Sequence, residues 1–500
     1  MSSGLPSLPS AQAKSIGTVQ RALLIGVDDF VTYASIYPAS TNNVFAMQEA
    51  LQASSDPFAT IMIPPEPVTS TARLTQLIQE TFAESQPQDV NYLYISSHGV
   101  YCGADATDPA LLLSDGKLED RLTPAALEAA FDGIAGTHIL LLDACYSGAF
   151  IGKGMHKQPE RLYFTGGNFK VLTSSGAMEE SWYWNNAQTA ADEAHAFPQG
   201  AFYFSQALSL SLSPRSGVPA DRNRDGSVTL QELYAALVQN HAASTPQVYP
   251  EDDTFPVFRY DLAALSDIEL SRSPITDVSF TNTTLSAADA QIGLEYIALR
   301  PVRVAYQIVH QREGQWRFEE AELVYDSVEQ YTAYGDERGA ISPGRKVRTL
   351  SLPLPPGNAG GYVMVQLVSI ENGKLTVHAG RVIVVLPMQA DLDLNVETPP
   401  SLVQGKHREL PIFIGHSTPC LLSVSIIDAQ GNTVRRLTHK QGTRPLGITP
   451  NGSVLYWNGK DKLGNPVAPG TYQVQVAGFL GDQRDQALSS PIEILAGDTP

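Results

Sequence analysis

A histidine and a cysteine that each follow an apolar run are the residues best suited to do chemistry in this sequence. His98 follows the run in NYLYISSHG, and Cys145 follows the run in HILLLDACYSG. A thiol is mostly protonated at neutral pH, whereas a neighbouring imidazole favours the thiolate and can later protonate a leaving amine. The amides of Gly99 and Cys145 could together bind an oxyanion. The pair predicts a cysteine nucleophile with a histidine base, and no cofactor for the chemistry itself.

The elements that must position this pair alternate along the first half of the chain. Apolar runs at 21–27, 59–63, 90–96 and 138–143 alternate with helical patterns, two of which begin after the N-cap residues Ser70 and Thr123. Such alternation predicts an α/β domain, a mostly parallel sheet flanked by helices. A right-handed crossover would make the strands before His98 and Cys145 parallel neighbours, and functional groups gather past the carboxyl ends of such strands. We therefore expect both side chains on one rim of the sheet.

The second half of the chain has a different pattern. Short runs with alternating apolar residues, separated by Gly and Pro turns, occur from 273 to 387 and from 397 to 495. This pattern predicts two β-sandwiches of about 100 residues each. The predicted domains are the α/β domain over 1–265, a sandwich over 270–390 and a second sandwich over 396–500.

Composition limits the partners and the compartment. The 500 residues include 33 Lys and Arg against 52 Asp and Glu, a net charge of -19, which disfavours binding to nucleic acid and to anionic membranes. No signal peptide or membrane span is visible. Three cysteines form no disulfide framework and suit a reducing compartment, so a cytoplasmic location is expected.

Four motifs resemble the caspase-like cysteine peptidases, a group that includes bacterial caspase homologues, metacaspases and clostripain-like enzymes. They are ALLIGVDDF, YISSHGV, LLLDACYSGAF and TPQ at 245–247, and the resemblance covers about the first 260 residues. Cys145 follows His98 by 47 residues, close to the roughly 50 residues found in caspases. The resemblance implies a caspase-like fold and an endopeptidase that acts on protein or peptide substrates, with Cys145 and His98 as its catalytic dyad.

The resemblance also bears on substrate choice. Caspases bind aspartate through arginines, yet no arginine occurs between Arg21 and Arg73, so cleavage after aspartate is disfavoured. In relatives that cleave after Arg or Lys, an aspartate two residues before the nucleophile lines the pocket, and Asp143 has that place. Metacaspases usually have a second pocket acid where this chain has Asn43.

Further substrate contacts follow from the same resemblance. Glu179 or Glu180 could supply the missing acid, although a solvated loop explains them equally well. Ser174 and Ser175 would form the wall that holds the substrate backbone. In the family, the loop after the nucleophile is often cut by the enzyme itself, and here the candidate self-cleavage points are Lys153, Lys157 and Arg161.

The segment DRNRDGSVTLQE at 221–232 matches the EF-hand consensus and lies between two helical patterns. Oxygens at alternate positions of a tight loop can converge on one hard cation. The sequence therefore predicts a calcium site, although Asp-Gly clusters of this kind also occur as simple turns. The predicted ligands are Asp221, Asn223, Asp225, the Ser227 carbonyl and Glu232.

The segment NGSVLYWNGKDKLGNPVAPGTYQVQVAG near the C-terminus resembles the Ig-like domain of the flagellar hook-capping protein, which is attached to many bacterial enzymes. This resemblance implies a fold and not an activity. It suits a stability module or a docking module for an unknown protein partner. A cysteine at the end of a buried strand is often only a packing residue. The alternative to a peptidase is therefore an inactive caspase-like scaffold that binds a partner through its sandwiches.

Overall fold

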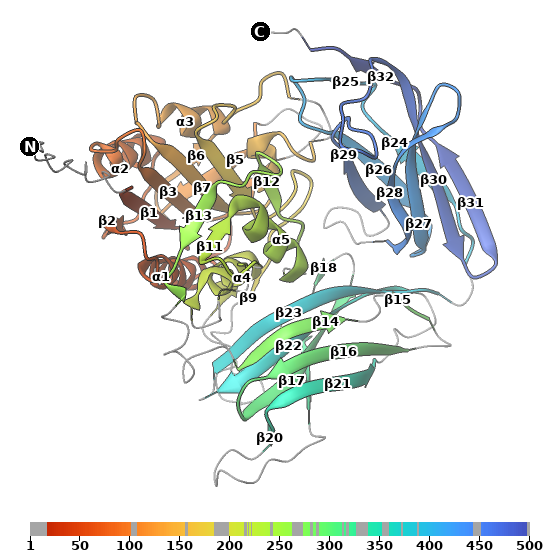
Figure 1. Ribbon diagram of the computed structural model, residues 1–500, viewed down its shortest axis with the longest axis horizontal. Helices are drawn as coiled ribbons and strands as arrows, with labels where there is room; N and C mark the ends of the chain where they lie inside the picture. The colour runs from red at the N-terminus through yellow and green to blue at the C-terminus, as the bar shows by residue number, and fades with distance from the viewer. Residues whose placement is uncertain are drawn as a thin grey trace, which may run out of the picture.

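The computed structural model describes most of the chain, and Figure 1 shows a body of helices and strands followed by two bodies of strands. Cys102 and the predicted self-cleavage point Lys157 lie outside the described residues. The described residues are 18–101, 108–155, 159–184, 200–214, 218, 220–221, 223–240, 244–262, 274–280, 284–286, 290–312, 315–316, 320–326, 339–352, 360–371, 374–387, 390–443 and 452–497.

The first body is built on a six-stranded sheet with the order β12-β8-β7-β3-β1-β2. All neighbouring strands in it are parallel except β12, which runs antiparallel to β8. A parallel sheet is covered on both faces, which explains why its central strands read as continuous apolar runs. The strands are β1 (Gln20–Gly26), β2 (Phe58–Met62), β3 (Val90–Ser96), β7 (Thr137–Asp143), β8 (Phe169–Thr173) and β12 (Gln247–Tyr249).

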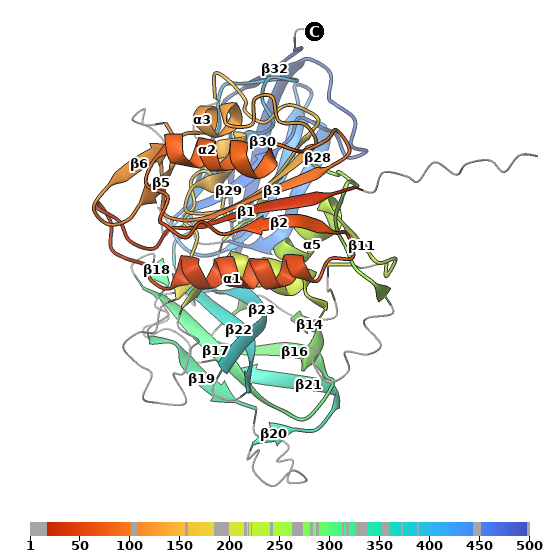
Figure 2. The same ribbon diagram turned by 90° about the vertical axis from the view of Figure 1, so that its left-hand side faces the viewer.

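Helices cover both faces of this sheet, and Figure 2 shows α1 (Ala39–Gln52) on one side with α2 (Thr71–Phe82) and α3 (Pro124–Ala129) on the other. The helices α4 (Tyr203–Leu212) and α5 (Leu230–Asn240) share the buried cluster of the α1 face. Ser70 and Thr123 cap α2 and α3 as predicted, since each side chain accepts a hydrogen bond from a first-turn amide. The mixed α/β first half is thus confirmed.

Short elements complete the first body. A small antiparallel sheet branches from the end of β3, and a 3-10 helix follows Cys145. These elements are β4 (Gly99–Val100), β5 (Ala110–Ser114), β6 (Glu119–Leu122), η1 (Ser147–Ile151), β9 (Tyr183–Trp184), β10 (Ala201–Phe202), β11 (Ser227–Thr229) and β13 (Pro256–Arg259).

The middle body consists of two antiparallel-rich sheets that share buried clusters, as expected for sheets packed face to face. One sheet contains β14 (Ile275–Phe280), β16 (Gln291–Ala298) and β21 (Gly344–Ser351). The other contains β15 (Thr284–Leu285), β17 (Val302–Arg312), β18 (Gln315–Trp316), β19 (Glu322–Tyr325), β20 (Ala340–Ile341), β22 (Gly361–Glu371) and β23 (Lys374–Val385).

The C-terminal body, from β24 to β32, repeats this plan around the buried Trp457, whose indole Nε1 donates to the Lys460 carbonyl at 2.9 Å. The second half of the chain is therefore formed of β-sheets, as the sequence pattern predicts. One sheet contains β24 (Leu394–Glu397), β26 (Leu410–His416) and β29 (Gly452–Trp457). The other contains β25 (Ser401–Val403), β27 (Leu421–Asp428), β28 (Thr433–Gly442), β30 (Gly470–Leu480), β31 (Gln483–Leu488) and β32 (Ile492–Leu495).

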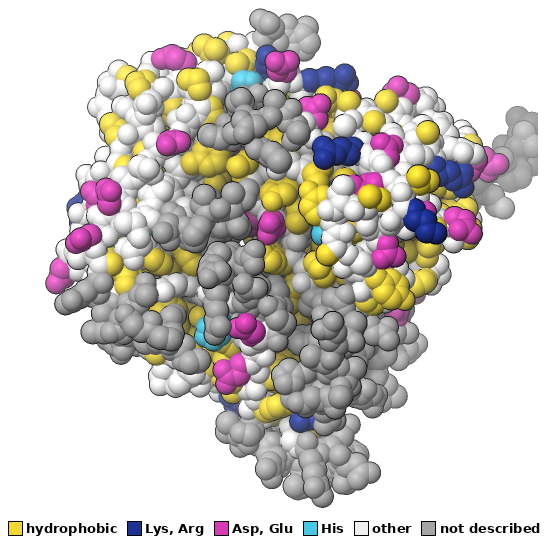
Figure 3. Space-filling model, turned by 180° about the vertical axis from the view of Figure 1, so that it is seen from behind, with side chains coloured by type: hydrophobic (Ala, Val, Ile, Leu, Met, Phe, Trp, Pro, Cys, Tyr) yellow, Lys and Arg dark blue, Asp and Glu magenta, His cyan; other side chains and the backbone are white. Residues whose placement is uncertain are grey.

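The surface carries charges of both signs. On the described part of the face in Figure 3, acidic and basic side chains are scattered among apolar ones and form no continuous basic patch. Within the described ranges, no helix is both long enough and apolar enough to cross a membrane.

Candidate active site

The strands that precede His98 and Cys145 are neighbours in the sheet. β3 and β7 pair in parallel and in register, and the last pair is Ser96 with Asp143. The Ser97 amide continues the ladder by donating to the Asp143 carbonyl at 3.1 Å. His98 and Cys145 each lie two residues beyond the last pair, so the register brings their backbones to the same rim of the sheet.

Gly99 brings the two strand ends into contact. A Cβ atom placed on Gly99 would lie 1.9 Å from the Cys145 carbonyl oxygen and 3.2 Å from its amide nitrogen. Real Cβ atoms never approach a backbone oxygen so closely, so only glycine fits. The segment that carries His98 therefore packs directly on the Cys145 backbone.

The His98 ring lies in an aromatic pocket formed by the segment between β1 and α1. Its centroid is 4.5 Å from that of Phe30 and 5.2 Å from that of Tyr33, and its Nε2 is 3.3 Å from the Ala34 carbonyl oxygen. Burial lowers the pKa of His98, against a smaller opposing effect of the Ala34 carbonyl and Glu119. The neutral imidazole is thus favoured, and if Nε2 donates to Ala34 then Nδ1 is left as an acceptor.

The Cys145 thiol is only partly exposed, and its Sγ lies 3.5 Å from the Ser181 carbonyl oxygen. Burial, together with the smaller effects of the charges of Glu180 and Asp143, raises the pKa of this thiol to about 12, although the hydrogen bond to Ser181 lowers it. Within the part of the chain that the structure describes, no hydrogen bond joins this sulfur to the His98 ring. In this arrangement the raised pKa keeps the thiol protonated at neutral pH.

The backbone just after the sulfur is strained. Tyr146 has a φ of 61° and a ψ of 14°, a left-handed conformation that non-glycine residues rarely adopt. Its amide donates to the Glu179 carbonyl at 2.8 Å, which fixes the turn into η1. Strain of this kind gathers at functional sites because the surrounding contacts impose it. No sequence signal marks this turn in advance.

Asp143 is fully buried beneath the rim, and three donors hold its carboxylate. The Ser181 hydroxyl donates to Oδ1 at 2.8 Å, while the amide and the hydroxyl of Ser205 donate to Oδ2 at 3.1 and 2.5 Å. Burial raises the pKa of Asp143 to about 6 despite these hydrogen bonds. Sequence reasoning missed Ser181 and Ser205, because hydroxyls distant in the chain leave no local pattern.

Asn43 also lies in this buried polar layer. Its Nδ2 donates to the Ser96 hydroxyl at 3.2 Å, and its Oδ1 accepts from the Phe202 amide at 3.1 Å. These bonds tie α1 to β3 and to β10. The side chain of Asn43 therefore fastens the elements beneath the rim, and no acid lies at this position.

Ser174 and Ser175 are fully buried, and their hydroxyls both donate to the Ala144 carbonyl, at 3.1 and 3.0 Å. The Glu179 carboxylate accepts from the amides of Thr245 at 2.8 Å and Gly176 at 3.2 Å. In this arrangement the side chains of Ser174, Ser175 and Glu179 support the backbone around the cysteine.

Glu180, the alternative to Glu179 in the sequence, has a different environment. It is partly buried and accepts from the Tyr146 hydroxyl at 3.4 Å. Burial raises the pKa of Glu180, and its charge acts on the Cys145 sulfur. Of the two glutamates, Glu180 is therefore the one coupled to the thiol.

The two described self-cleavage candidates are held by acidic partners. The side chain of Lys153 is 4% exposed, and its Nζ lies 2.5 Å from Glu251 and 3.9 Å from Glu409. Arg161 is exposed and pairs with Glu128 of α3 at 2.6 Å. The burial of Lys153 disfavours its cleavage, whereas Arg161 remains accessible.

Comparison with known proteins adds little at the level of sequence. No protein-family model matches the chain, and no curated protein matches it either.

Three solved structures show weak similarity. Latent PorU from Porphyromonas gingivalis has 13% identity and a TM-score of 0.19 over 50% of this chain, which spans only 22% of that protein. Protein GSU0716 from Geobacter sulfurreducens has 15% identity and a TM-score of 0.31, covering 49% of this chain and 96% of its own. Caspase-1 from Spodoptera frugiperda has 13% identity and a TM-score of 0.28, covering 52% and 97%. Similarity this weak carries no argument, so the site must be judged on its own geometry.

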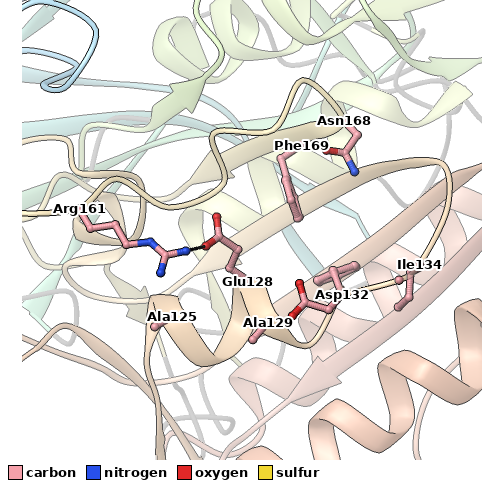
Figure 4. A pocket seen from close by; sticks show the side chains of 10 residues that line it. Ala125, Glu128, Ala129, Asp132, Ile134, Arg161, Asn168 and Phe169 are labelled. Carbon is pink, nitrogen blue, oxygen red and sulfur yellow. Dashed lines mark hydrogen bonds and ion pairs between the residues drawn. The ribbon is translucent and has the colours of Figure 1, made fainter. Parts of the chain in front are cut away.

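A cavity of about 560 Å³ lies away from this rim, at the amino ends of β7 and β8. Figure 4 shows Glu128 of α3 paired with Arg161 among the lining residues, which also include Phe169. Since the cysteine and histidine lie past the carboxyl ends of the same strands, this cavity does not belong to the candidate active site.

The segment 221–232 lies after α4 and runs into the first turn of α5, so a helix lies on either side of it as predicted. The Asp221 carboxylate accepts from the Tyr260 hydroxyl at 2.7 Å and from the amides of Arg224 and Gly226 at 2.7 and 3.0 Å. Glu232 folds back on Thr229, accepting from its amide at 3.0 Å, while the Glu232 amide donates to the Thr229 hydroxyl at 3.2 Å. This reciprocal pair is a capping box at the start of α5.

The predicted calcium ligands do not converge in this arrangement. Asn223 and Asp225 bond to each other, and the Ser227 amide donates to Asp225 at 2.8 Å. Among the residues that the structure describes, no three His, Cys, Asp or Glu side chains gather where they would hold a metal ion. The residues as arranged do not fit a cation, and calcium binding stays a prediction from sequence.

Substitution of Glu232 distinguishes a helix-capping role from a role as a calcium ligand. If Glu232 acts as a helix cap, Glu232→Ala should lower the free energy of unfolding by about 1 kcal/mol, while Glu232→Gln should be nearly neutral because glutamine also completes a capping box. Urea denaturation with calcium and with chelator measures both variants, and we expect calcium to change neither result. A parent protein stabilised by calcium, with that gain lost in Glu232→Gln, would restore the calcium site.

Proposed function

We propose that this chain is a cysteine endopeptidase with a caspase-like fold, in which Cys145 attacks a peptide carbonyl and His98 handles the proton. One observation carries the proposal: the in-register pairing of β3 and β7 brings a histidine and a cysteine to one rim, with Gly99 packed on the Cys145 backbone. The amides of Gly99 and Cys145 would then hold the oxyanion.

The proposed chemistry requires a change from the described arrangement. The imidazole Nδ1, which is the acceptor when Nε2 donates to the Ala34 carbonyl, would take the thiol proton, and the contact between the sulfur and the Ser181 carbonyl would break. Catalytic contacts are often loose in the absence of substrate and tighten when it binds. Binding of a substrate backbone that displaces Tyr33 or Ser181 would allow this change.

Cleavage after Arg or Lys is the specificity that the charges favour. The charges of Glu180 and of the buried Asp143 both raise the pKa of the Cys145 thiol, so a cationic substrate side chain bound near the sulfur would be attracted by them. The same cation would offset the two negative charges that add to the effect of burial in raising the pKa of the thiol. Binding of the preferred substrate would therefore assist formation of the thiolate.

The direct test uses short fluorogenic peptides. The purified chain should hydrolyse peptides that end in Arg or Lys and should leave the matched peptides that end in Asp uncut. Hydrolysis of the Asp peptides in preference would reject the specificity, while hydrolysis of none of them would reject the proposal.

A second candidate function is a scaffold without catalysis, in which the sandwiches bind a protein partner. The raised pKa of Cys145 favours it, as does the lack, among the described residues, of a hydrogen bond between the Cys145 sulfur and the His98 ring. The same peptide assay distinguishes the two functions, because a scaffold has no Cys145-dependent turnover. The Ig-like identity of the C-terminal body, a cytoplasmic location and the absence of nucleic-acid partners remain predictions.

The role of Asp143 can be separated from stability. Its pKa of about 6 lies above the ordinary value near 3.9, so folding favours the protonated form and stability falls as the pH rises from about 4 to 6. Asp143→Asn should raise the free energy of unfolding at pH 7 by about 2 to 3 kcal/mol, while turnover of Arg peptides falls by at least about tenfold. Urea denaturation and peptide kinetics measure the two effects.

Asp89→Asn is the matched control for that experiment. Burial alone would raise the pKa of Asp89, but amide hydrogen bonds and Arg21, at 2.9 Å, hold it below its ordinary value. Its stabilising effect is therefore present above the unfolded pKa and is lost as the pH falls, so Asp89→Asn should destabilise the protein at pH 7. A stabilising effect of Asp89→Asn, or unchanged Arg turnover in Asp143→Asn, would contradict the assignment.

A further inference from the structure

The C-terminal body contacts the segment that follows the cysteine. Arg408, just before β26, donates from Nη1 to the Ile151 carbonyl at 2.5 Å and from Nη2 to the Tyr163 carbonyl at 2.6 Å. Its guanidinium also lies 3.3 Å from the centroid of the Tyr249 ring. A planar fork that bonds two carbonyls while it stacks on a ring is specific to arginine.

An ion cluster reinforces this contact. The Lys153 ammonium, which belongs to the segment after the cysteine, lies between Glu251 of the first body and Glu409 of the C-terminal body. The side chains of Lys153 and Glu409 are each 4% exposed. Separating the two bodies would leave the Lys153 charge without Glu409, so the cluster favours the contact between them.

Tyr456 of β29 reaches further toward the site. A Cβ atom placed on Gly154 would lie 2.5 Å from the Tyr456 hydroxyl oxygen, and one placed on Gly176 would lie 2.9 Å from it. Side chains at these two positions would push the hydroxyl away. The ring of Tyr456 is therefore inserted between two glycine-containing segments of the first body.

These two segments are hydrogen-bonded to each other and to the turn that follows the cysteine. The Ala177 amide donates to the Lys153 carbonyl at 3.1 Å, and the Gly148 amide donates to the Ser175 carbonyl at 2.9 Å. The second segment continues to Ser181, whose carbonyl oxygen contacts the Cys145 sulfur. A displacement of segment 151–154 or 175–181 would therefore alter the contacts of the thiol, because hydrogen bonds connect both segments to its surroundings.

We propose that the C-terminal body is a working part of the active site, in which Arg408, Glu409 and Tyr456 are positioning residues that fix segments 151–154 and 175–181 around Cys145. This inference rests on the proposed peptidase function for its kinetic consequences. A misplacement of about 1 Å at reacting groups can cost about 100-fold in rate, so a remote brace can matter as much as a direct contact.

The test uses the full chain with Arg408→Gln and Tyr456→Phe, each a mild substitution. Arg484→Gln is the matched control, because Arg484 lies over the Phe479 ring within the same body. Cys145 is alkylated with iodoacetamide and assigned by peptide mass spectrometry, a readout that needs no catalysis. Loosening the two segments should free the sulfur from Ser181, so we expect Arg408→Gln to raise the alkylation rate and lower kcat, each by about tenfold, with a smaller change in KM.

Thermal unfolding of the same variants identifies a purely structural role. Measurements are made well below the unfolding midpoint of each variant. Unchanged alkylation and kcat in both variants, with only a lower midpoint, would overturn the inference and leave the C-terminal body as a stability module. If the parent lacks peptidase activity, the proposed function fails. The alkylation rates would still test whether the C-terminal body positions the segments around Cys145.

Discussion

Replacing Cys145 by alanine is expected to abolish the hydrolysis of Arg and Lys peptides, with a loss of at least about 1,000-fold. The reason is that alanine offers no sulfur to form the acyl-enzyme, while the strand and its neighbours are unchanged. His98→Ala should cost nearly as much. The double substitution should cost no more than the larger single effect, because the two groups act as a unit. Steady-state kinetics with a fluorogenic Arg peptide measures all three variants.

Cys420→Ala is the matched control for this experiment. Cys420 is fully buried in the C-terminal body and contributes only packing there, so its replacement should leave the kinetics unchanged. Activity that survives in Cys145→Ala would reject the nucleophile. If the rate losses of Cys145→Ala and His98→Ala multiply in the double variant, the two residues do not act as a dyad, although each would still contribute to the rate.

Replacing Gly99 by alanine is the second substitution with a large expected effect. The added methyl carbon would overlap the Cys145 carbonyl oxygen at 1.9 Å, and because that atom belongs to the backbone, the two strand ends would have to separate. Forcing an extra methyl into a packed site usually costs about 1 to 3 kcal/mol in stability. We expect the peptidase rate to fall by at least about 100-fold, since the oxyanion donor and the nucleophile are both displaced.

Gly167→Ala provides the control, because a Cβ atom there would meet no atom within 4 Å. Denaturation and peptide kinetics should leave that variant close to the parent. A Gly99→Ala protein with parental kcat would mean that the segment carrying His98 does not pack on the cysteine as described, and the geometric basis of the proposed function would fail with it.

The sheet that carries this site was accessible from sequence for a physical reason. Continuous apolar runs such as 90–96 and 138–143 belong to parallel strands buried on both faces, and the intervening helical patterns force a crossover between them. Once two such strands are neighbours, the residues just past their carboxyl ends share a rim. Local caps such as Ser70 were equally predictable, because the bond is made within one turn.

The directions of the side chains were not accessible in this way. His98 faces the Ala34 carbonyl because Phe30 and Tyr33, 60 or more residues earlier in the chain, provide its aromatic pocket. Glu179 and Glu180 are adjacent in sequence, yet Thr245 holds the first and leaves the second beside the sulfur. The directions of these side chains depend on contacts with residues far away in the chain, so no local sequence pattern predicts them.

The EF-hand consensus illustrates a different difficulty. The ligand pattern of 221–232 is complete in sequence, yet Thr229 and Glu232 also match the capping-box pattern. In the structure these two residues form the hydrogen bonds of a capping box. One set of residues can satisfy two motifs that demand different carboxylate directions. The contacts of the C-terminal body with Lys153 and Gly154 were equally hidden, because nothing in the sequence around Glu409 or Tyr456 indicates a distant partner.

The pairing of β7 with β8 has a consequence for any chain broken in the loop between them. The two strands pair through hydrogen bonds, and Arg408 donates hydrogen bonds to Ile151 and Tyr163, which lie on either side of Arg161 in that loop. A nick at Arg161 would therefore leave two polypeptides in one particle of unchanged size. Gel filtration would not detect it, and the fragments would separate only in denaturant.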